Sequence, residues 1–158
     1  MIFRKLSQTV PDIFKKDSTV RQVYRCNPLF HGRPQYDWVA LSSIWITAKT
    51  GKISDFNIAQ LQLLFQFQHE GTIFNLACVQ HFKMYDERDP ETGMYILERV
   101  DSYEVIPVSA IEHNVHLIPY FDNPSSARDS LNKRCDEYSF QKYLLNHFSD
   151  RYIYICCN

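Results

Sequence analysis

The feature that most constrains this chain is a stretch in which apolar and amide side chains alternate. Odd positions carry Ala59, Leu61, Leu63, Phe65 and Phe67, and even positions carry Gln60, Gln62, Gln66 and Gln68, with Leu64 as the exception. A period of two is typical of a strand with one buried face, because successive side chains of a strand point to opposite faces. We therefore predict a strand. The alternative is a helix with one apolar face, made by Ile58, Leu61, Leu64 and Phe65.

The neighbouring segments extend this β pattern. Further extended segments are expected at Tyr36–Thr47, Phe74–Met84, Met94–Val100, Tyr103–Val108 and Val115–Tyr120. Gly51, Gly71 and Gly93 lie in polar connections and suit turns that need a positive φ angle. Pro107 and Pro119 suit a strand end or a sheet edge. The expected fold is mainly β, a small curved antiparallel sheet or a partly open barrel.

The C-terminal part of the sequence has a different pattern. The polar run Asp122–Asp129 predicts a domain boundary. Beyond it, apolar side chains recur at the spacing of one helix face, at Phe140, Tyr143, Leu144, His147 and Phe148. Arg151–Cys157 returns to β-type composition and is a candidate edge strand. We predict an N-terminal arm over residues 1–17, a β-barrel interaction domain over 18–122, and a linker, a C-terminal α-helix and the candidate edge strand over 123–158.

Charge and composition exclude several classes of protein. The 17 Lys and Arg residues against 18 Asp and Glu give a formal net charge of −1, which argues against tight nucleic-acid binding by the chain as a whole. No apolar run approaches the roughly 18 residues that cross a bilayer, so we expect neither a membrane span nor a signal peptide. The unevenly spaced cysteines are Cys26, Cys78, Cys135, Cys156 and Cys157. Such an odd set is typical of free thiols, which predicts an intracellular protein.

The sequence offers no constellation that predicts catalysis. His113 and His116 are three residues apart in an extended segment, so they project from opposite faces and make a poor metal pair. The acidic run Asp86–Asp89 precedes a turn and is typical of a solvated loop. Nothing resembles an activated nucleophile with its base. We expect a non-enzymatic chain without cofactor or metal.

The segment Phe30–Val39 is rich in aromatic residues and has two interpretations. It is either a loop that enters the first strand of the barrel, with Trp38 in the core, or part of an exposed aromatic groove. In the second interpretation the groove binds a peptide or a cationic side chain. The residues then expected to contact the partner are Tyr36, Trp38, His81, Phe82 and Tyr85.

Several motifs in this order resemble the bromo-adjacent homology (BAH) domain, a β-barrel interaction module of chromatin proteins. They are Tyr36-Asp37-Trp38-Val39, Ile58-Ala59-Gln60-Leu61 to Phe65, Leu76 to Tyr85, and Val105-Ile106-Pro107-Val108-Ser109-Ala110-Ile111 to Val115-His116-Leu117-Ile118-Pro119. The resemblance spans about residues 36–120 and implies a barrel that binds a histone or another chromatin protein. Where such domains often carry a Trp-Phe pair, this chain has His81-Phe82, which argues against an aromatic cage for methyl-lysine.

A second resemblance covers more of the chain. The motifs are Arg25-Cys26-Asn27-Pro28 with Phe30 to Asp37, the Val105 to Phe121 segment, and Phe140 to Arg151. They are similar to the C-terminal region of fungal transposon-encoded proteins of the Plavaka type, related to the Kyakuja-Dileera-Zisupton transposases. In those proteins the catalytic carboxylates lie upstream, so the resemblance implies an accessory domain without transposase activity.

These observations lead to two hypotheses of function. The first is a non-catalytic, chromatin-associated and nuclear protein-interaction module that resembles the BAH domain, binds a protein or peptide partner, and derives from a transposon-encoded protein. The second is a DNA-binding accessory domain of a transposase. Its contacts would come from Arg21, Arg25, Arg33 and Lys49.

Overall fold

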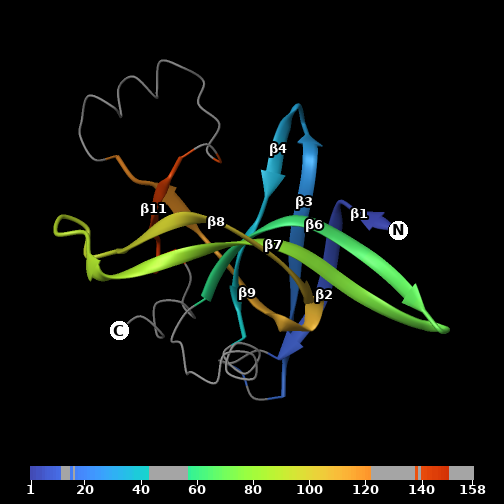
Figure 1. Cartoon of the computed structure of the whole chain (residues 1–158). Helices are drawn as coiled ribbons and strands as arrows, with labels where there is room; N and C mark the ends of the chain where they lie inside the picture. The colour runs from blue at the N-terminus through green and yellow to red at the C-terminus, as the bar shows by residue number, and fades with distance from the viewer. Residues whose placement is uncertain (12–14, 16, 43–56, 122–137, 139, 150–158) are drawn as a thin grey trace. The chain divides into compact units, whose positions relative to one another are not determined.

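The computed structural model describes residues 1–11, 15, 17–42, 57–121, 138 and 140–149, and all statements below concern these residues. The strands are β1 Ile2–Phe3, β2 Lys5–Pro11, β3 Thr19–Phe30, β4 Arg33–Tyr36, β5 Trp38–Leu41, β6 Asn57–His69, β7 Thr72–Arg88, β8 Tyr95–Pro107, β9 Ile111–Val115, β10 Leu117–Pro119 and β11 Lys142–Leu145 (Figure 1). One 3-10 turn, η1, covers Val108–Ala110. The prediction of a mainly β chain is confirmed.

The strands form two antiparallel sheets. The larger has the hydrogen-bonded order β10-β11-β8-β7-β6-β5-β9, with β1 also paired to β6, and the smaller has the order β2-β3-β4. The larger order ends at β10 and β9, so the described strands do not close into a ring. No described helix is both long and apolar enough to cross a membrane.

The chain divides into two compact units, which we describe separately. The first holds residues 1–82 and 100–115, and the second holds 83–99 and the residues from 116 onward. The core of the first unit is buried and apolar, with Tyr24, Val39, Leu61, Val79 and Ile106 among its members. The second unit buries side chains from three strands, Leu97, Leu117, Tyr143 and Leu145.

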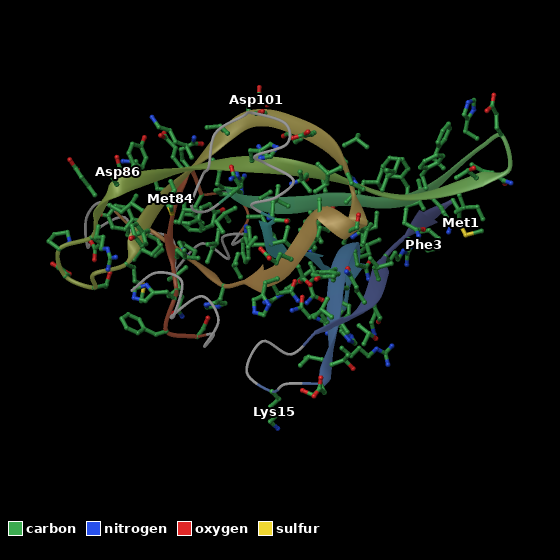
Figure 2. All side chains as sticks on the ribbon, turned by 90° about the horizontal axis from the view of Figure 1, so that it is seen from below. Met1, Phe3, Lys15, Met84, Asp86 and Asp101 are labelled. Atoms are coloured by element: carbon green, nitrogen blue, oxygen red, sulfur yellow. The ribbon has the colours of Figure 1, made fainter. Side chains whose placement is uncertain are left out.

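The N-terminal segment forms strands that pair with two different partners. β1 pairs with β6, and β2 pairs with β3 along its whole length. The N-terminal ammonium of Met1 donates a hydrogen bond to the carbonyl of Gln66, at 3.0 Å, beside β6 (Figure 2). The domain boundaries that we expect at residues 17 and 122 stay predictions.

The alternating stretch is a strand, as predicted, and the helix alternative is wrong. The register between β6 and β7 shifts between Leu61 and Leu63, as at a β-bulge. An extra residue in one strand reverses which side chains face the core beyond it. Leu61 and Leu64 are therefore both fully buried, while Leu63 is half-buried. The one exception in the sequence pattern, Leu64, marks the place where the buried face changes parity.

The predicted turn at Gly71 is confirmed. Glu70 and Gly71 both have positive φ angles, 48° and 78°, and they connect the paired residues His69 and Thr72. Two successive positive φ angles are typical of the type I′ hairpin turn, where glycine avoids the steric cost. Gly93, with φ 69°, lies in the connection from β7 to β8. The expected turn at residue 51 lies outside the described residues.

A further hairpin lies where we expected a loop. His31 and Gly32 have φ angles of 49° and 79° and connect β3 to β4, with Phe30 paired to Arg33. The proline prediction is confirmed, because β8 ends at Pro107 and β10 ends at Pro119. β8 is one continuous strand over the two extended segments that we expected there.

The predicted C-terminal helix is not found, because Lys142–Leu145 forms β11. This strand lies between β10 and β8, and Leu144 pairs with Ile118 on one side and with Ile96 on the other. Tyr143, Leu144 and Leu145 are all buried, so both faces of the strand are covered. A strand covered on both faces lacks a period of two, which explains its helix-like apolar spacing. The polar run 122–129 that we predicted as a boundary and the candidate edge strand at 151–157 lie outside the described residues.

Candidate functional site

The residues that we expected to contact a partner are mostly buried or half-buried in the first unit. Trp38 and Phe82 are each 8% exposed. Tyr36 is half-buried and packs against the core. The interpretation of Trp38 as a core residue is thus confirmed, whereas a partner-binding role for these side chains stays a prediction.

His81 and Tyr85, the other two expected contact residues, have polar partners within the chain. His81 Nε2 lies 3.0 Å from a carboxylate oxygen of Glu104, and both side chains are about one-fifth exposed. Tyr85 belongs to the second unit, where its hydroxyl donates a hydrogen bond to Glu98 and this bond raises the pKa of Tyr85. The Lys83 ammonium lies 4.9 Å from the centre of the Tyr85 ring.

A row of amide side chains is buried next to Trp38. Trp38 pairs with Gln60, and Gln60 pairs with Gln80. Gln62 donates to the Gln60 side-chain oxygen at 3.0 Å, and Gln80 donates to the carbonyl of Val100 at 3.2 Å. Burying an amide without hydrogen bonds is costly, so these bonds stabilise the row, although the Gln60 side-chain nitrogen is buried without a partner. Alternation predicts a single buried face, but at this end of β6 the amide Gln60 is buried as well as the apolar residues beside it.

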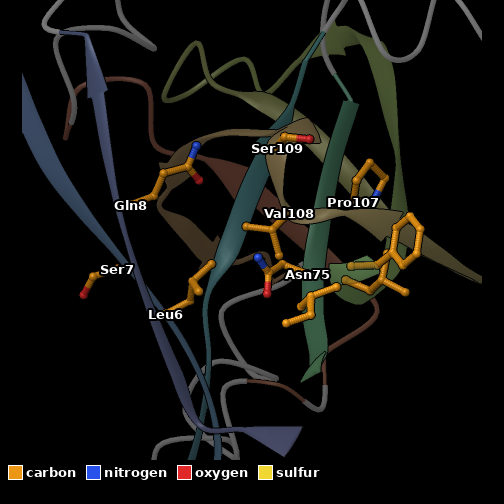
Figure 3. A pocket seen from close by; sticks show the side chains of 10 residues that line it. Leu6, Ser7, Gln8, Asn75, Pro107, Val108 and Ser109 are labelled. Carbon is orange, nitrogen blue, oxygen red and sulfur yellow. The ribbon is translucent and has the colours of Figure 1, made fainter. Parts of the chain in front are cut away.

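An open pocket of about 430 Å³ lies elsewhere in the first unit (Figure 3). It is lined by Leu6, Ser7, Gln8, Ile73, Phe74, Asn75, Leu76, Pro107, Val108 and Ser109. Three consecutive residues of β2 and four of β7 contribute to it, although neighbouring side chains of a strand point to opposite faces. The pocket therefore runs along β2 and along the first residues of β7, at the point where β8 ends.

The pocket has an apolar rim and polar groups inside it. Ile73 and Phe74 are 56% and 43% exposed, although they are large and apolar. All residues from 67 to 75 are exposed, so this end of the β6–β7 hairpin is not covered by the rest of the chain. The Gln8 side chain points into the pocket in Figure 3, and its oxygen is buried without a hydrogen-bond partner. A buried acceptor of this kind is satisfied when a ligand supplies an N–H group.

The edge of β2 offers further hydrogen-bonding groups. β2 is the last strand of its sheet, with β3 as its one strand partner among the described residues. In an antiparallel strand, about half of the backbone N–H and C=O groups point away from the paired neighbour. Such an edge can pair with an added strand. The pocket and the edge together have the groups that an extended peptide needs.

The cationic residues of the second hypothesis lie on the small sheet. Arg21 and Arg25 belong to β3, and Arg33 begins β4. Arg25 lies 4.0 Å from Asp37, and burial raises the pKa of Asp37 although the backbone N–H of Arg25 donates to it. Lys49 lies outside the described residues.

Neither the histidines nor the thiols assemble a reactive centre in the described part of the chain. His113 Nδ1 accepts from Gln22 at 2.7 Å, and His116 has Asn146 as its partner at 3.1 Å. Burial raises the pKa of Cys26 to about 11, which disfavours its thiolate. The described residues include no group of three or more His, Cys, Asp or Glu side chains that could hold a metal ion.

Comparisons of the chain with protein-family models, with curated proteins and with solved structures found no match.

Sequence reasoning missed the pocket because three segments far apart in the chain build it. The sequence feature that could have indicated the pocket is Phe74, a large apolar residue close to the turn glycine Gly71. Phe74 begins one of the extended segments that we predicted, and its side chain is exposed.

Proposed function

We propose that this chain is a non-catalytic protein-interaction module that binds an extended segment of a partner protein along the free edge of β2. The observation that carries the proposal is the pocket beside this edge, with its exposed apolar rim at Ile73 and Phe74. In this mode of recognition, backbone hydrogen bonds supply affinity, and pockets for alternate side chains supply specificity.

The chemistry of the lining favours binding over catalysis. Its polar side chains are hydroxyls and amides, from Ser7, Gln8, Asn75 and Ser109. None of the lining residues is titratable, so the pocket has no side chain of its own to act as general acid or base. The apolar lining, which includes Leu6, Leu76 and Val108, suits an aliphatic or aromatic side chain of the partner.

The resemblance to the BAH domain extends this proposal to the identity of the partner. A chromatin protein, such as a histone tail, supplies extended segments of the required kind. We place the chain in the nucleus on the same ground, with an origin in a transposon-encoded protein.

The test is a selection of peptides from a random-sequence library on the folded protein, together with an array of histone peptides. A selected peptide is then titrated by fluorescence anisotropy. We expect Ile73→Asp to weaken binding at least tenfold. Leu29→Asp is the matched control, because Leu29 is 69% exposed, belongs to the same unit and does not line the pocket.

Amide hydrogen exchange locates the bound peptide. We expect protection of the β2 amides on binding, because added backbone hydrogen bonds slow their exchange. The proposal fails if the folded protein selects no peptide. It fails equally if a selected peptide binds Ile73→Asp as tightly as the unchanged chain and leaves β2 unprotected.

A further inference from the structure

Positive charge is concentrated at the start of the chain. Residues 1–42 carry the cations Arg4, Lys5, Lys15, Lys16, Arg21, Arg25 and Arg33 and the acids Asp12, Asp17 and Asp37. This segment therefore has a net charge of +4, and the rest of the chain has a net charge of −5. The two charges nearly cancel in the whole chain. The near-neutral charge of the whole chain therefore conceals a cationic segment, which forms β1 to β5.

The strand register places several of these cations on one face of the small sheet. Lys5 pairs directly with Arg25, and Thr9 pairs with Arg21. Residues opposite each other share a face, and so do residues four apart on one strand. Leu6 and Tyr24, which alternate with these positions, face the core. The face with Lys5, Arg21 and Arg25 therefore points outward.

β4, the third strand of the small sheet, continues this outward face. Asn27 pairs with Gln35, one step along from the inward pair of Cys26 and Tyr36. Arg33 is two residues from Gln35 on β4, so it shares the outward face. Three of the four residues in the second hypothesis are thus on one surface with Lys5. We call the surface formed by Lys5, Arg21, Arg25 and Arg33 the cationic face.

The pairing of Lys5 with Arg25 is unfavourable unless an anion lies between the two side chains. Their Cβ atoms are about 5 Å apart in such a pair, and like charges directly opposite each other destabilise a sheet. Asp37 partly balances Arg25, yet the Arg25 side chain remains 40% exposed. Arg21 donates to the Ser7 hydroxyl at 3.1 Å, which leaves its charge without a carboxylate in this contact.

We infer that the cationic face binds the phosphodiester backbone of a nucleic acid. Guanidinium, ammonium, hydroxyl and amide groups are those that contact phosphates in protein–DNA complexes. The face supplies the first three types, through Arg21, Lys5 and Ser7. Arg21 and Arg25 are about 13 Å apart along β3, from a rise of about 3.3 Å per residue, so the cations reach separate phosphates. Such contacts do not depend on base sequence.

The number of contacts predicts the dependence on salt. For about three phosphates, affinity for duplex DNA falls about 40-fold between 50 and 200 mM salt. The expected dissociation constant lies in the range of non-specific binding, roughly 10⁻⁴ to 10⁻⁶ M. Single-stranded DNA is expected to show a shallower slope.

The test is anisotropy of a labelled duplex, and of one of its strands alone, titrated with the full chain at several salt concentrations. The double variant Lys5→Gln, Arg21→Gln is expected to lower affinity at 50 mM salt at least tenfold. The control Lys83→Gln, Arg88→Gln removes the same charge from exposed positions in the second unit and is expected to change affinity less than threefold. Near-UV circular dichroism verifies that both variants fold.

Several results would overturn the inference. Equal losses in the two double variants would show an effect of net charge alone. Absence of binding to either form of DNA, or binding to vesicles rich in anionic lipid in its place, would assign the face to another partner. The inference stands apart from the proposed function, because Ile73→Asp should bind DNA normally, whereas Arg33→Gln, on β4 and outside the pocket lining, should weaken DNA binding and bind the selected peptide normally.

Discussion

Replacing Leu64 by alanine tests the register shift in β6, on which the description of the core depends. Leu64 is 1% exposed and belongs to the core of the first unit. Truncating a buried leucine removes its transfer free energy and leaves a cavity, which together cost about 3 kcal/mol. Leu63 is half-buried and lies outside that core, so Leu63→Ala is expected to cost about 1 kcal/mol or less. For a chain of this length, the larger loss lowers the melting temperature by roughly 6 to 12 °C.

Both variants are unfolded in urea and followed by tryptophan fluorescence, with Trp38 as a buried reporter on the adjacent strand. Leu61→Ala serves as the positive control, because Leu61 is fully buried in either register. A simple alternation without a bulge would bury Leu63 and expose Leu64. A larger loss of unfolding free energy in Leu63→Ala than in Leu64→Ala would therefore refute the shifted register.

Three further predictions follow from buried polar groups. The Cys26 thiol, whose pKa burial raises to about 11, should resist a disulfide reagent at pH 8 in the folded protein and react once unfolded in urea, as measured by mass spectrometry. Burial raises the pKa of Asp37 above its ordinary 3.8, so the charged form costs stability, and this cost grows as pH rises from the ordinary pKa to the folded pKa and is constant above it. Asp37→Asn should therefore gain stability relative to the unchanged chain between pH 4 and pH 7 in urea titrations, and a relative loss would contradict this sign. Tyr24→Phe removes a 2.6 Å hydrogen bond to Gln22 and should cost about 1 kcal/mol. It should also remove a tyrosine that ionises near pH 12 in ultraviolet titration.

The parts of the fold that were predictable are those with a local cause. The strand at β6 follows from side-chain alternation, and the turn after it follows from the glycine that a positive φ requires. β11 was not predictable in this way. Its buried run Tyr143-Leu144-Leu145 has neighbours on both sides, and these neighbours come from segments more than twenty residues away in sequence. Apolar spacing alone does not distinguish such a strand from a helix.

The same distinction between local and long-range causes applies to the candidate sites. Arg21, Arg25 and Arg33 were recognisable as cations in the sequence, but their common face depends on the register of β3 with its two neighbours. The pocket depends on contacts between β2, β7 and the end of β8, and no local pattern reports those. Aromatic content near Trp38 did not distinguish the two interpretations of that segment, because an aromatic side chain fills a core as readily as it lines a groove.

The composition of β2 explains why its free edge can act as a specific site. An exposed edge strand invites pairing with any extended chain, and proteins limit this hazard with charged residues and prolines. β2 begins at Lys5 and ends at Pro11, which has no backbone N–H to donate. Pairing is therefore hindered at both ends and favoured in the middle, where Leu6, Ser7 and Gln8 line the pocket. The partner strand that we propose must also satisfy the pocket, so we expect the ends of β2 to favour a short peptide over open-ended aggregation.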